Sequence, residues 1–215
     1  MTLQITANLS TLAKQSGSVA SWPFPATPAQ PTMFFHGGSE IYGEGEDAGT
    51  VYQVEFGCVR IHRLMADGRR QIAAFHLPGE VFGFESEGTH QFFAEAVGAT
   101  GIRMTRQTAA IQASPGFLPL ALRTLSRAQR HLLVVGRQNA IERVAAFLLD
   151  MAERQGGLDR IDLPMSRGDI ADYLGLTVET VSRIFTKLRA KGIIRLDGAR
   201  EIEIVRWQAL VDMIE

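Results

Sequence analysis

The stretch that decides the fold is Met165–Gly192, MSRGDIADYLGLTVETVSRIFTKLRAKG. Ser166 is a good N-cap, because its hydroxyl can accept a hydrogen bond from a free backbone N–H of the helix it opens. Asp169 adds a carboxylate at the positive end of that helix. Gly175 permits a sharp turn because it has no Cβ, and Thr177 can cap a second helix. Helical spacing gives each helix one apolar face, formed by Ile170, Ala171 and Leu174 and by Val181, Ile184, Phe185 and Leu188. The stretch therefore predicts a helix-turn-helix.

The second predicted helix presents four residues near its start, away from its apolar face: Val178, Glu179, Ser182 and Arg183. Arginine can form two hydrogen bonds to guanine, and glutamate can accept one from the cytosine amine, so these residue types suit a DNA major groove. Glu179 and Arg183 are also four residues apart and can bond each other, which leaves an ordinary surface salt bridge as the alternative. Further donors suited to phosphate contacts favour DNA binding; they are Ser166, Arg167, Thr177, Thr180, Lys187 and Arg195.

The run LGLTVETVSR, residues 174–183, resembles the recognition segment of the CRP/FNR superfamily of bacterial transcription regulators. More narrowly it resembles the FNR and FixK branch, in which Val, Glu, Ser and Arg stand at the four exposed places. The cyclic-AMP receptor branch has Arg where Val178 stands. The resemblance covers nearly all of residues 33–206. It implies DNA binding at inverted repeats of the TTGAT-N4-ATCAA kind.

Size and charge agree with such a protein. The chain has 215 residues, enough for one large or two modest domains. A net charge of −1 does not mark a nucleic-acid binder, but residues 165–200 hold seven Arg or Lys against four acids. A local basic face is sufficient, because counterion release depends on the phosphates contacted. No apolar run approaches the roughly 20 residues that span a bilayer, and the start lacks a secretory signal pattern. We expect a cytoplasmic protein with no membrane partner.

Composition and turn signals divide the chain into four parts. Residues 1–30 are rich in Ser, Thr, Ala, Gln and Pro and predict a flexible arm. Residues 31–110 alternate short apolar runs with glycine-containing turns, which predicts an antiparallel β-roll. Residues 111–137 predict a dimerisation helix and hinge, and residues 138–215 a winged helix-turn-helix. The predicted class is therefore α+β.

The predicted roll includes strands at 51–54, 59–64 and 72–75. In the second of these we expect Val59, Ile61 and Leu64 to face inward, and Arg60, His62 and Arg63 to face outward, as strand alternation requires. The run from Tyr42 to Gly83 resembles the sensory, cyclic-nucleotide-binding-domain-like roll of the same superfamily.

The residues present do not suit a cyclic nucleotide, which is the ligand that this resemblance implies. Cyclic-nucleotide-binding members carry an Arg-Ser pair after a PGE turn. Here the turn is Pro78–Glu80, but the aligned pair is Phe92–Phe93, beside neutral Gln91. Two aromatic rings can neither neutralise a phosphate nor donate to it. We therefore expect no bound cyclic nucleotide, and only a turn role for Glu80.

Metal, cofactor and redox chemistry have little support in the sequence. An iron–sulfur cluster needs about four thiolates, and the chain has one cysteine, Cys58, expected to be buried. The five histidines form no ligand pair; His76 is the best single candidate, and an ordinary strand or loop histidine is the simpler interpretation. No catalytic motif is present. The lack of clustered His and Glu also disfavours a cupin-like metal enzyme. We expect no cofactor, no metal and no enzyme activity.

A long helix is predicted within Pro115–Val135. Six apolar residues follow steps of 3, 4, 3, 4 and 3, the seam of a coiled coil; they are Leu118, Ala121, Leu125, Ala128, Leu132 and Val135. We expect Leu122 and Leu133 to pack back on the roll. Gly136 is expected to end the helix in the left-handed conformation. The alternative is a core helix of a monomer, whereas the resemblance implies the dimer helix of the superfamily.

The last part completes the winged helix-turn-helix. Asn139 is expected to cap a helix over 140–155, and two strands at 193–196 and 201–205 predict a wing that brings Arg195 near phosphates. The whole sequence therefore predicts a homodimeric transcription regulator, and the resemblance implies activation through RNA polymerase. One alternative adds an unidentified effector bound in the roll. A second alternative is a β-roll binding module or enzyme whose DNA-binding domain is degenerate. The presence of both Glu179 and Arg183 argues against such degeneracy.

Overall fold

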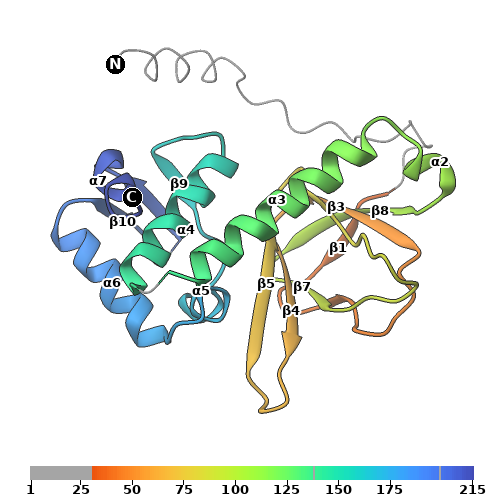
Figure 1. Cartoon of the computed structure of the whole chain (residues 1–215), viewed down its shortest axis with the longest axis horizontal. Coiled ribbons are helices and arrows are strands. Elements are labelled where there is room, and N and C mark those ends of the chain that lie inside the picture. Colours follow the sequence, from red (N-terminus) through yellow and green to blue (C-terminus); the bar gives the residue numbers. More distant parts are fainter. Residues whose placement is uncertain (1–30, 138, 199) are drawn as a thin grey trace.

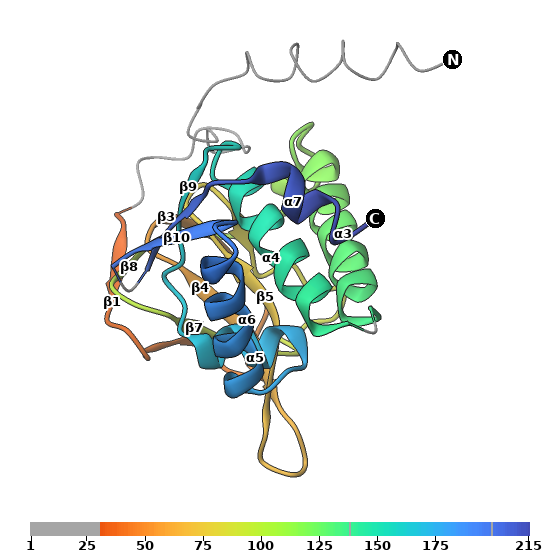
Figure 2. The same ribbon diagram turned by 90° about the vertical axis from the view of Figure 1, so that its left-hand side faces the viewer.

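The computed structural model describes residues 31–137, 139–198 and 200–215, so the predicted arm lies outside the described residues. The chain forms a β-roll and a second, mainly helical part, and the long helix α3 runs between them (Figure 1). In Figure 2 the helices α4 to α7 face the viewer, with the strands of the roll behind them. Within the described residues, no helix combines the length and the apolar character needed to cross a membrane.

The roll consists of two four-stranded antiparallel sheets, as the turn-rich pattern predicted. The first has the strand order β1-β8-β3-β6 and is formed by β1 (Met33–Phe35), β3 (Thr50–Phe56), β6 (Val81–Phe82) and β8 (Thr100–Arg106). The second has the order β2-β7-β4-β5 and is formed by β2 (Glu40–Tyr42), β4 (Val59–Leu64), β5 (Arg70–His76) and β7 (Phe93–Ala96). The three predicted strands coincide with β3, β4 and β5.

The predicted side-chain alternation of β4 is only partly right. Val59 and Ile61 are buried as expected, but His62 is buried too and Leu64 is 56% exposed. The pairing of β4 with β5 shifts register between Ile61 and His62. The extra residue of this bulge is Ala73 of β5, so β4 itself is not bulged and pairs with β7 without a shift. The prediction for His62 and Leu64 failed because their burial depends on the neighbouring strand: His62 stacks on Phe93 of β7, whereas Leu64 lies beyond the last residue of β4 that pairs with β7.

Three helices follow the roll: α2 (Ala109–Gln112), α3 (Phe117–Val135) and α4 (Ala140–Arg154). The side chain of Asn139 caps α4 as predicted. Gly136 ends α3 with φ −70°, so the left-handed ending expected there is wrong.

The two faces of α3 differ in their surroundings. Phe117, Leu120 and Val134 are partly buried against the core. Five leucines are more than half exposed and define the α3 stripe: Leu118, Leu122, Leu125, Leu132 and Leu133. The expectation that Leu122 and Leu133 pack on the roll is therefore wrong, because the half-buried positions of the helix fall at 117, 120, 121, 127, 131, 134 and 135.

The C-terminal part is a winged helix-turn-helix. It contains β9 (Arg160–Asp162), α5 (Arg167–Leu174), α6 (Val178–Ala190), β10 (Ile194–Asp197), β11 (Glu201–Ile204) and α7 (Trp207–Val211). The strands form an antiparallel sheet in the order β10-β11-β9, in which β10 and β11 are the predicted wing.

One continuous apolar cluster joins the roll to this part. It contains Ile72 and Phe75 of β5 together with Leu148 and Met151 of α4 and Ile170 of α5, none more than 2% exposed. Burial of such side chains is worth roughly 1.5–3 kcal/mol each. The two parts therefore share a core and do not merely touch.

Candidate nucleic-acid interface

The local structure of the helix-turn-helix follows from its capping residues. The Ser166 hydroxyl accepts a hydrogen bond from the Asp169 backbone N–H at 3.0 Å, and the Asp169 carboxylate accepts one from the Ser166 N–H at 3.0 Å. This reciprocal pair is a capping box. Gly175 ends α5 with φ +63°, and Thr177 caps α6 by accepting from the Thr180 N–H at 3.2 Å. These roles are the predicted ones.

The helix α6 has one buried and one open face. Its buried residues are Val181, Ile184, Phe185 and Leu188. The four predicted base-contacting residues are all exposed near its start: Val178, Glu179, Ser182 and Arg183. The helix therefore presents them together, beside the turn that leads from α5.

Glu179 and Arg183, which could form a salt bridge on the same face of α6, do not form one in the structure. Among the described residues, Arg183 has neither a hydrogen-bonding nor an ionic partner. Hydrogen bonds from backbone N–H and from the Thr177 hydroxyl hold the pKa of Glu179 below its usual range, with a smaller contribution from Arg183. The salt-bridge alternative is thus not what the structure contains.

The predicted phosphate-contacting residues differ in how free they are. Ser166, Thr177 and Lys187 are exposed, and Thr180 is half-buried. Arg167 is also half-buried, with its guanidinium carbon 3.4 Å from the centre of the Phe185 ring, and burial lowers its pKa. Arg195 pairs with Glu203 across the wing but keeps a side chain that is 65% exposed.

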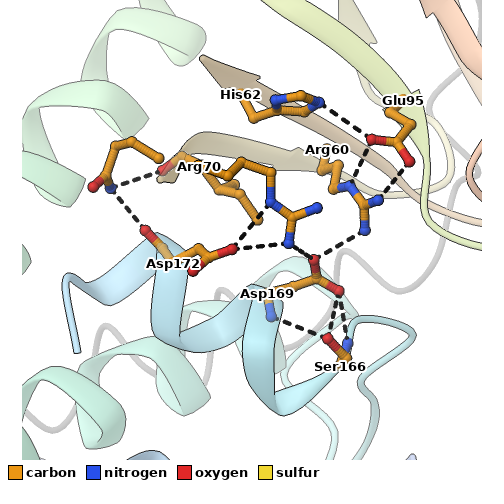
Figure 3. A network of polar contacts seen from close by, with 9 residues as sticks. Arg60, His62, Arg70, Glu95, Ser166, Asp169 and Asp172 are labelled. Carbon is orange, nitrogen blue, oxygen red and sulfur yellow. Dashed lines mark hydrogen bonds and ion pairs between the residues drawn. The ribbon is translucent and has the colours of Figure 1, made fainter. Parts of the chain in front are cut away.

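Sequence reasoning missed a cluster of charges between the roll and α5. Asp169 is only 5% exposed in its side chain, and its Oδ1 accepts from Arg60 at 2.9 Å and from Arg70 at 2.6 Å. Arg70 also pairs with Asp172 at 2.8 Å. We call these four residues the interdomain clasp; Figure 3 shows both arginines reaching from the roll toward Asp169. Local sequence could not reveal them, because the partners lie 99 to 109 residues apart.

Glu80 makes a second connection and has more than the turn role expected of it. Its carboxylate accepts from the Leu77 N–H within the turn, and it also pairs with Arg154 of α4 at 2.8 Å and Arg127 of α3 at 3.0 Å. Burial opposes its ionisation, but the two arginines hold the pKa of Glu80 below its usual range. Neighbouring His76 is buried, and burial lowers its pKa to about 4. At neutral pH this histidine is uncharged.

The aromatic pair and the cysteine that were considered as ligand or redox sites pack against neighbouring side chains or are buried. Phe93 stacks on His62 with ring centres 5.5 Å apart, and the Arg63 guanidinium lies 5.5 Å from the centre of Phe92. Burial raises the pKa of the Cys58 thiol to about 12, so it is a poor nucleophile at neutral pH. The part of the chain that the structure describes contains no group of three His, Cys, Asp or Glu that could hold a metal ion.

A cavity of about 490 Å³ lies where β5, α3, α4 and α7 meet. Aromatic side chains line it, among them Phe75, Tyr173 and Trp207. Three of its lining residues have a buried nitrogen without a hydrogen-bond partner: His76, His131 and Arg137. Its volume is in the range of small-molecule sites, which often lie between domains.

The predicted dimer seam on α3 is only partly at the surface. Leu118, Leu125 and Leu132 are more than half exposed, and Ala128 is exposed. Ala121 and Val135 are half-buried. The exposed apolar surface thus follows the α3 stripe and not the whole predicted seam.

Comparison with known proteins agrees with the site. The family of the Crp-like helix-turn-helix domain matches residues 142–213, and that of the cyclic nucleotide-binding domain matches residues 32–102. Nitrogen fixation regulation protein FixK of Rhizobium meliloti is 51% identical over 188 residues, which cover 87% of this chain and 89% of that protein. Transcriptional activatory protein AadR of Rhodopseudomonas palustris is 39% identical over 183 residues, 79% of this chain and 77% of that protein.

A solved structure agrees as well. That of FixK2 from Bradyrhizobium japonicum superimposes with a TM-score of 0.80 at 42% identity, covering 87% of this chain and 98% of that chain. These relatives are transcription regulators and not enzymes, so the predicted lack of enzymatic function is confirmed. The chain belongs to the CRP/FNR family of transcription regulators, as a FixK-like member with a helix-turn-helix DNA-binding domain.

Proposed function

We propose that this protein is a transcription activator that binds TTGAT-N4-ATCAA-like inverted repeats as a homodimer, without a cyclic nucleotide or an iron–sulfur cluster. The observation that carries the proposal is the open start of α6. There Val178, Glu179, Ser182 and Arg183 are exposed together, and the guanidinium of Arg183 has no partner among the described residues.

Each of the four residues has a role in the proposed half-site. Arg183 donates two hydrogen bonds to the guanine, and Glu179 accepts one from the adjoining cytosine amine. Val178 contacts a thymine methyl, and Ser182 adjusts the remaining contacts. Phosphates would be bound by Ser166, Arg167, Thr177, Thr180, Lys187 and Arg195, of which Arg167 and Arg195 must leave their present partners.

Dimerisation is supported by the α3 stripe. Five leucines that are more than half exposed lie on one face of this helix, and exposed apolar patches of this kind often mark protein–protein contacts. The seam we propose keeps Leu118, Leu125 and Leu132 and adds Leu122 and Leu133. A two-fold axis along α3 would present two recognition helices to half-sites about one helical turn apart.

Independence from cyclic nucleotides is supported by the roll. Phe92 and Phe93 stand where a phosphate-binding pair would be expected, and the Glu80 carboxylate is already occupied by two arginines. Activation is supported by the name of the relative AadR. A contact with RNA polymerase is proposed for the turn Glu85–His90, in which residues 86–89 are exposed and His90 is buried.

The test is binding of purified, ligand-free protein to a duplex with TTGAT and ATCAA half-sites, against a scrambled duplex at the same stated salt concentration. We expect selective binding by a dimer. The variant Leu125→Asp with Leu132→Asp should be monomeric in sedimentation and bind the operator at least about 100-fold more weakly, since one half-site contact is lost. Equal binding to both duplexes would reject the proposed operator.

A second candidate function is gating by a small effector, and the cavity beside His131 favours it. To separate the two, native protein is compared with protein that has been unfolded, dialysed and refolded, which removes small molecules. Equal operator binding supports the ligand-free activator. Binding that is lost on refolding and restored by a cell extract of small molecules supports gating. Titration with cyclic AMP and cyclic GMP tests the roll itself.

A further inference from the structure

The interdomain clasp uses both oxygens of one buried carboxylate for two purposes. Asp169 Oδ2 accepts from the Ser166 N–H at 3.0 Å and from the Ser166 hydroxyl at 2.8 Å, which caps α5. Oδ1 faces the other way and accepts from Arg60 and Arg70. The carboxylate of Asp169, which completes the cap of α5, is therefore also the group that two arginines of the roll bind (Figure 3).

Each arginine of the clasp has a second acidic partner. The partner of Arg60 lies in the roll, and that of Arg70 lies on α5. Arg60 of β4 pairs with Glu95 of β7, whose other contact is His62 at 3.2 Å. Arg70 at the start of β5 binds both Asp169 and Asp172, one turn apart on α5. Gln71 adds a hydrogen bond to the Asp172 carbonyl at 2.8 Å. Two adjacent strands thus hold α5 at two successive positions along its axis.

Placement of α5 sets the placement of the recognition helix. Ile170 and Leu174 of α5 are buried in the same apolar cluster as Val181 and Phe185 of α6. Gly175 makes the connection between the helices short. An arrangement in which α6 moves relative to the roll therefore requires α5 to leave the clasp.

We infer that Arg60, Arg70 and Asp169 are positioning residues for DNA binding: through α5 they hold α6 at a set angle to the roll, so that a dimer joined at α3 accepts one spacing between half-sites. This inference rests on the proposed function. An added base pair moves a half-site by about 3.4 Å and turns it by roughly 35°. A held recognition helix cannot follow that movement, whereas a released one can.

The test uses two neighbouring arginines of one hairpin. Arg70→Glu places a third carboxylate against Asp169 and Asp172. Arg69→Glu is the matched control, because it makes the same charge change at a side chain that is 82% exposed and whose ionic partner among the described residues is Asp67. Each dimer, verified by sedimentation, is titrated with the operator and with the same operator lengthened by one and by two base pairs in its spacer.

We expect wild type and Arg69→Glu to lose about 100-fold or more in affinity on the lengthened operators. Arg70→Glu should bind the original operator roughly tenfold more weakly and lose less than about tenfold on lengthening, in the range of known coupling between sites. A structural defect without a positioning role would weaken binding to all spacings equally. Discrimination at individual bases should be unchanged in both variants.

A gentler variant keeps the test informative if Arg70→Glu does not fold. Asp172→Asn weakens the same ion pair from the side of α5, and we expect a smaller change of the same kind, about twofold to tenfold in the spacing ratio. The inference is overturned if both clasp variants keep the wild-type spacing ratio, or if Arg69→Glu relaxes it equally. If wild type binds no operator selectively, the proposed function fails instead, and the two failures are distinct.

Discussion

The two helices of the helix-turn-helix begin alike and use their charges in opposite ways. Each starts with a hydroxyl cap and has an acid in its first turn, Asp169 in α5 and Glu179 in α6. Asp169 is 5% exposed in its side chain and is bound by two arginines of the roll. Glu179 is exposed, and neighbouring Arg183 has no hydrogen-bonding or ionic partner within the part of the chain that the structure describes.

This difference separates charges that hold the parts of the protein together from charges that are available to bind a ligand. The charges between the roll and the DNA-binding part neutralise one another within the protein, so they contribute to the arrangement of its parts. The charges at the start of α6 lack such partners, so they are available to a ligand. Four predictions test the contrast, beginning with the largest expected effect.

Replacing the two acids by alanine should give very different stabilities. Asp169→Ala removes the buried carboxylate that Arg60 and Arg70 share and the carboxylate half of the capping box, and should lower the free energy of unfolding by about 3–5 kcal/mol. Glu179→Ala should change it by no more than about 0.5 kcal/mol. Urea unfolding at one protein concentration measures both. Similar values for the two variants would remove the distinction between α5 and α6.

The buried junction should also respond to pH. Burial lowers the pKa of His76 from 6.5 to about 4, next to Glu80, Arg154 and Arg127. Because the folded pKa is the lower one, the unfolded chain takes up this proton first as the pH falls. Stability is therefore lost progressively from about pH 6.5 to about pH 4, by up to roughly 3 kcal/mol.

The variant His76→Gln provides the control for that pH dependence. It should unfold with a free energy that changes less over the same interval, while acids such as Glu80 lose their contribution only at lower pH. Urea unfolding at pH 4.5 and pH 7 measures the difference. An unchanged slope in His76→Gln would show that this histidine does not titrate in the way its burial implies.

The open face should affect recognition and not stability. Arg183→Ala should weaken operator binding by about 1–3 kcal/mol and relax discrimination at one base pair. Arg183→Lys should recover the charge but only part of the discrimination, because an ammonium on a flexible stem lacks the rigid, planar pair of donors of a guanidinium. Binding to operators with each base substituted measures this. A uniform loss across all sequences would instead show a phosphate contact.

The smallest effect is expected at Lys187. It is exposed on α6, and Lys187→Ala should weaken binding to all duplexes by less than about tenfold. The slope of log affinity against log salt should fall by about 1 for each protomer, because one phosphate contact is lost. Titration at three salt concentrations measures the slope; a change confined to one base pair would assign Lys187 to base recognition.

Much of the fold could be predicted because its signals are local. Ser166, Thr177 and Asn139 cap helices that periodic apolar residues define, and the strands β3 to β5 follow short apolar runs between turns. The prediction failed where the signal is not local. The burial of His62 and the outward position of Leu122 depend on strand pairing and on the direction from which the roll meets α3.

The sequence by itself determined that α6 would have a buried stripe and an open face with Glu179 and Arg183, since helical geometry alone assigns residues to faces. It also identified the family, through the run at 174–183. Only the tertiary structure decided which charges are free. Asp169 and Glu179 are both acids in the first turn of a helix with a hydroxyl cap, but Arg60 and Arg70, about a hundred residues away, are folded against Asp169 and not against Glu179. Charge pairing across a domain junction depends on distances in space, which local sequence patterns do not contain.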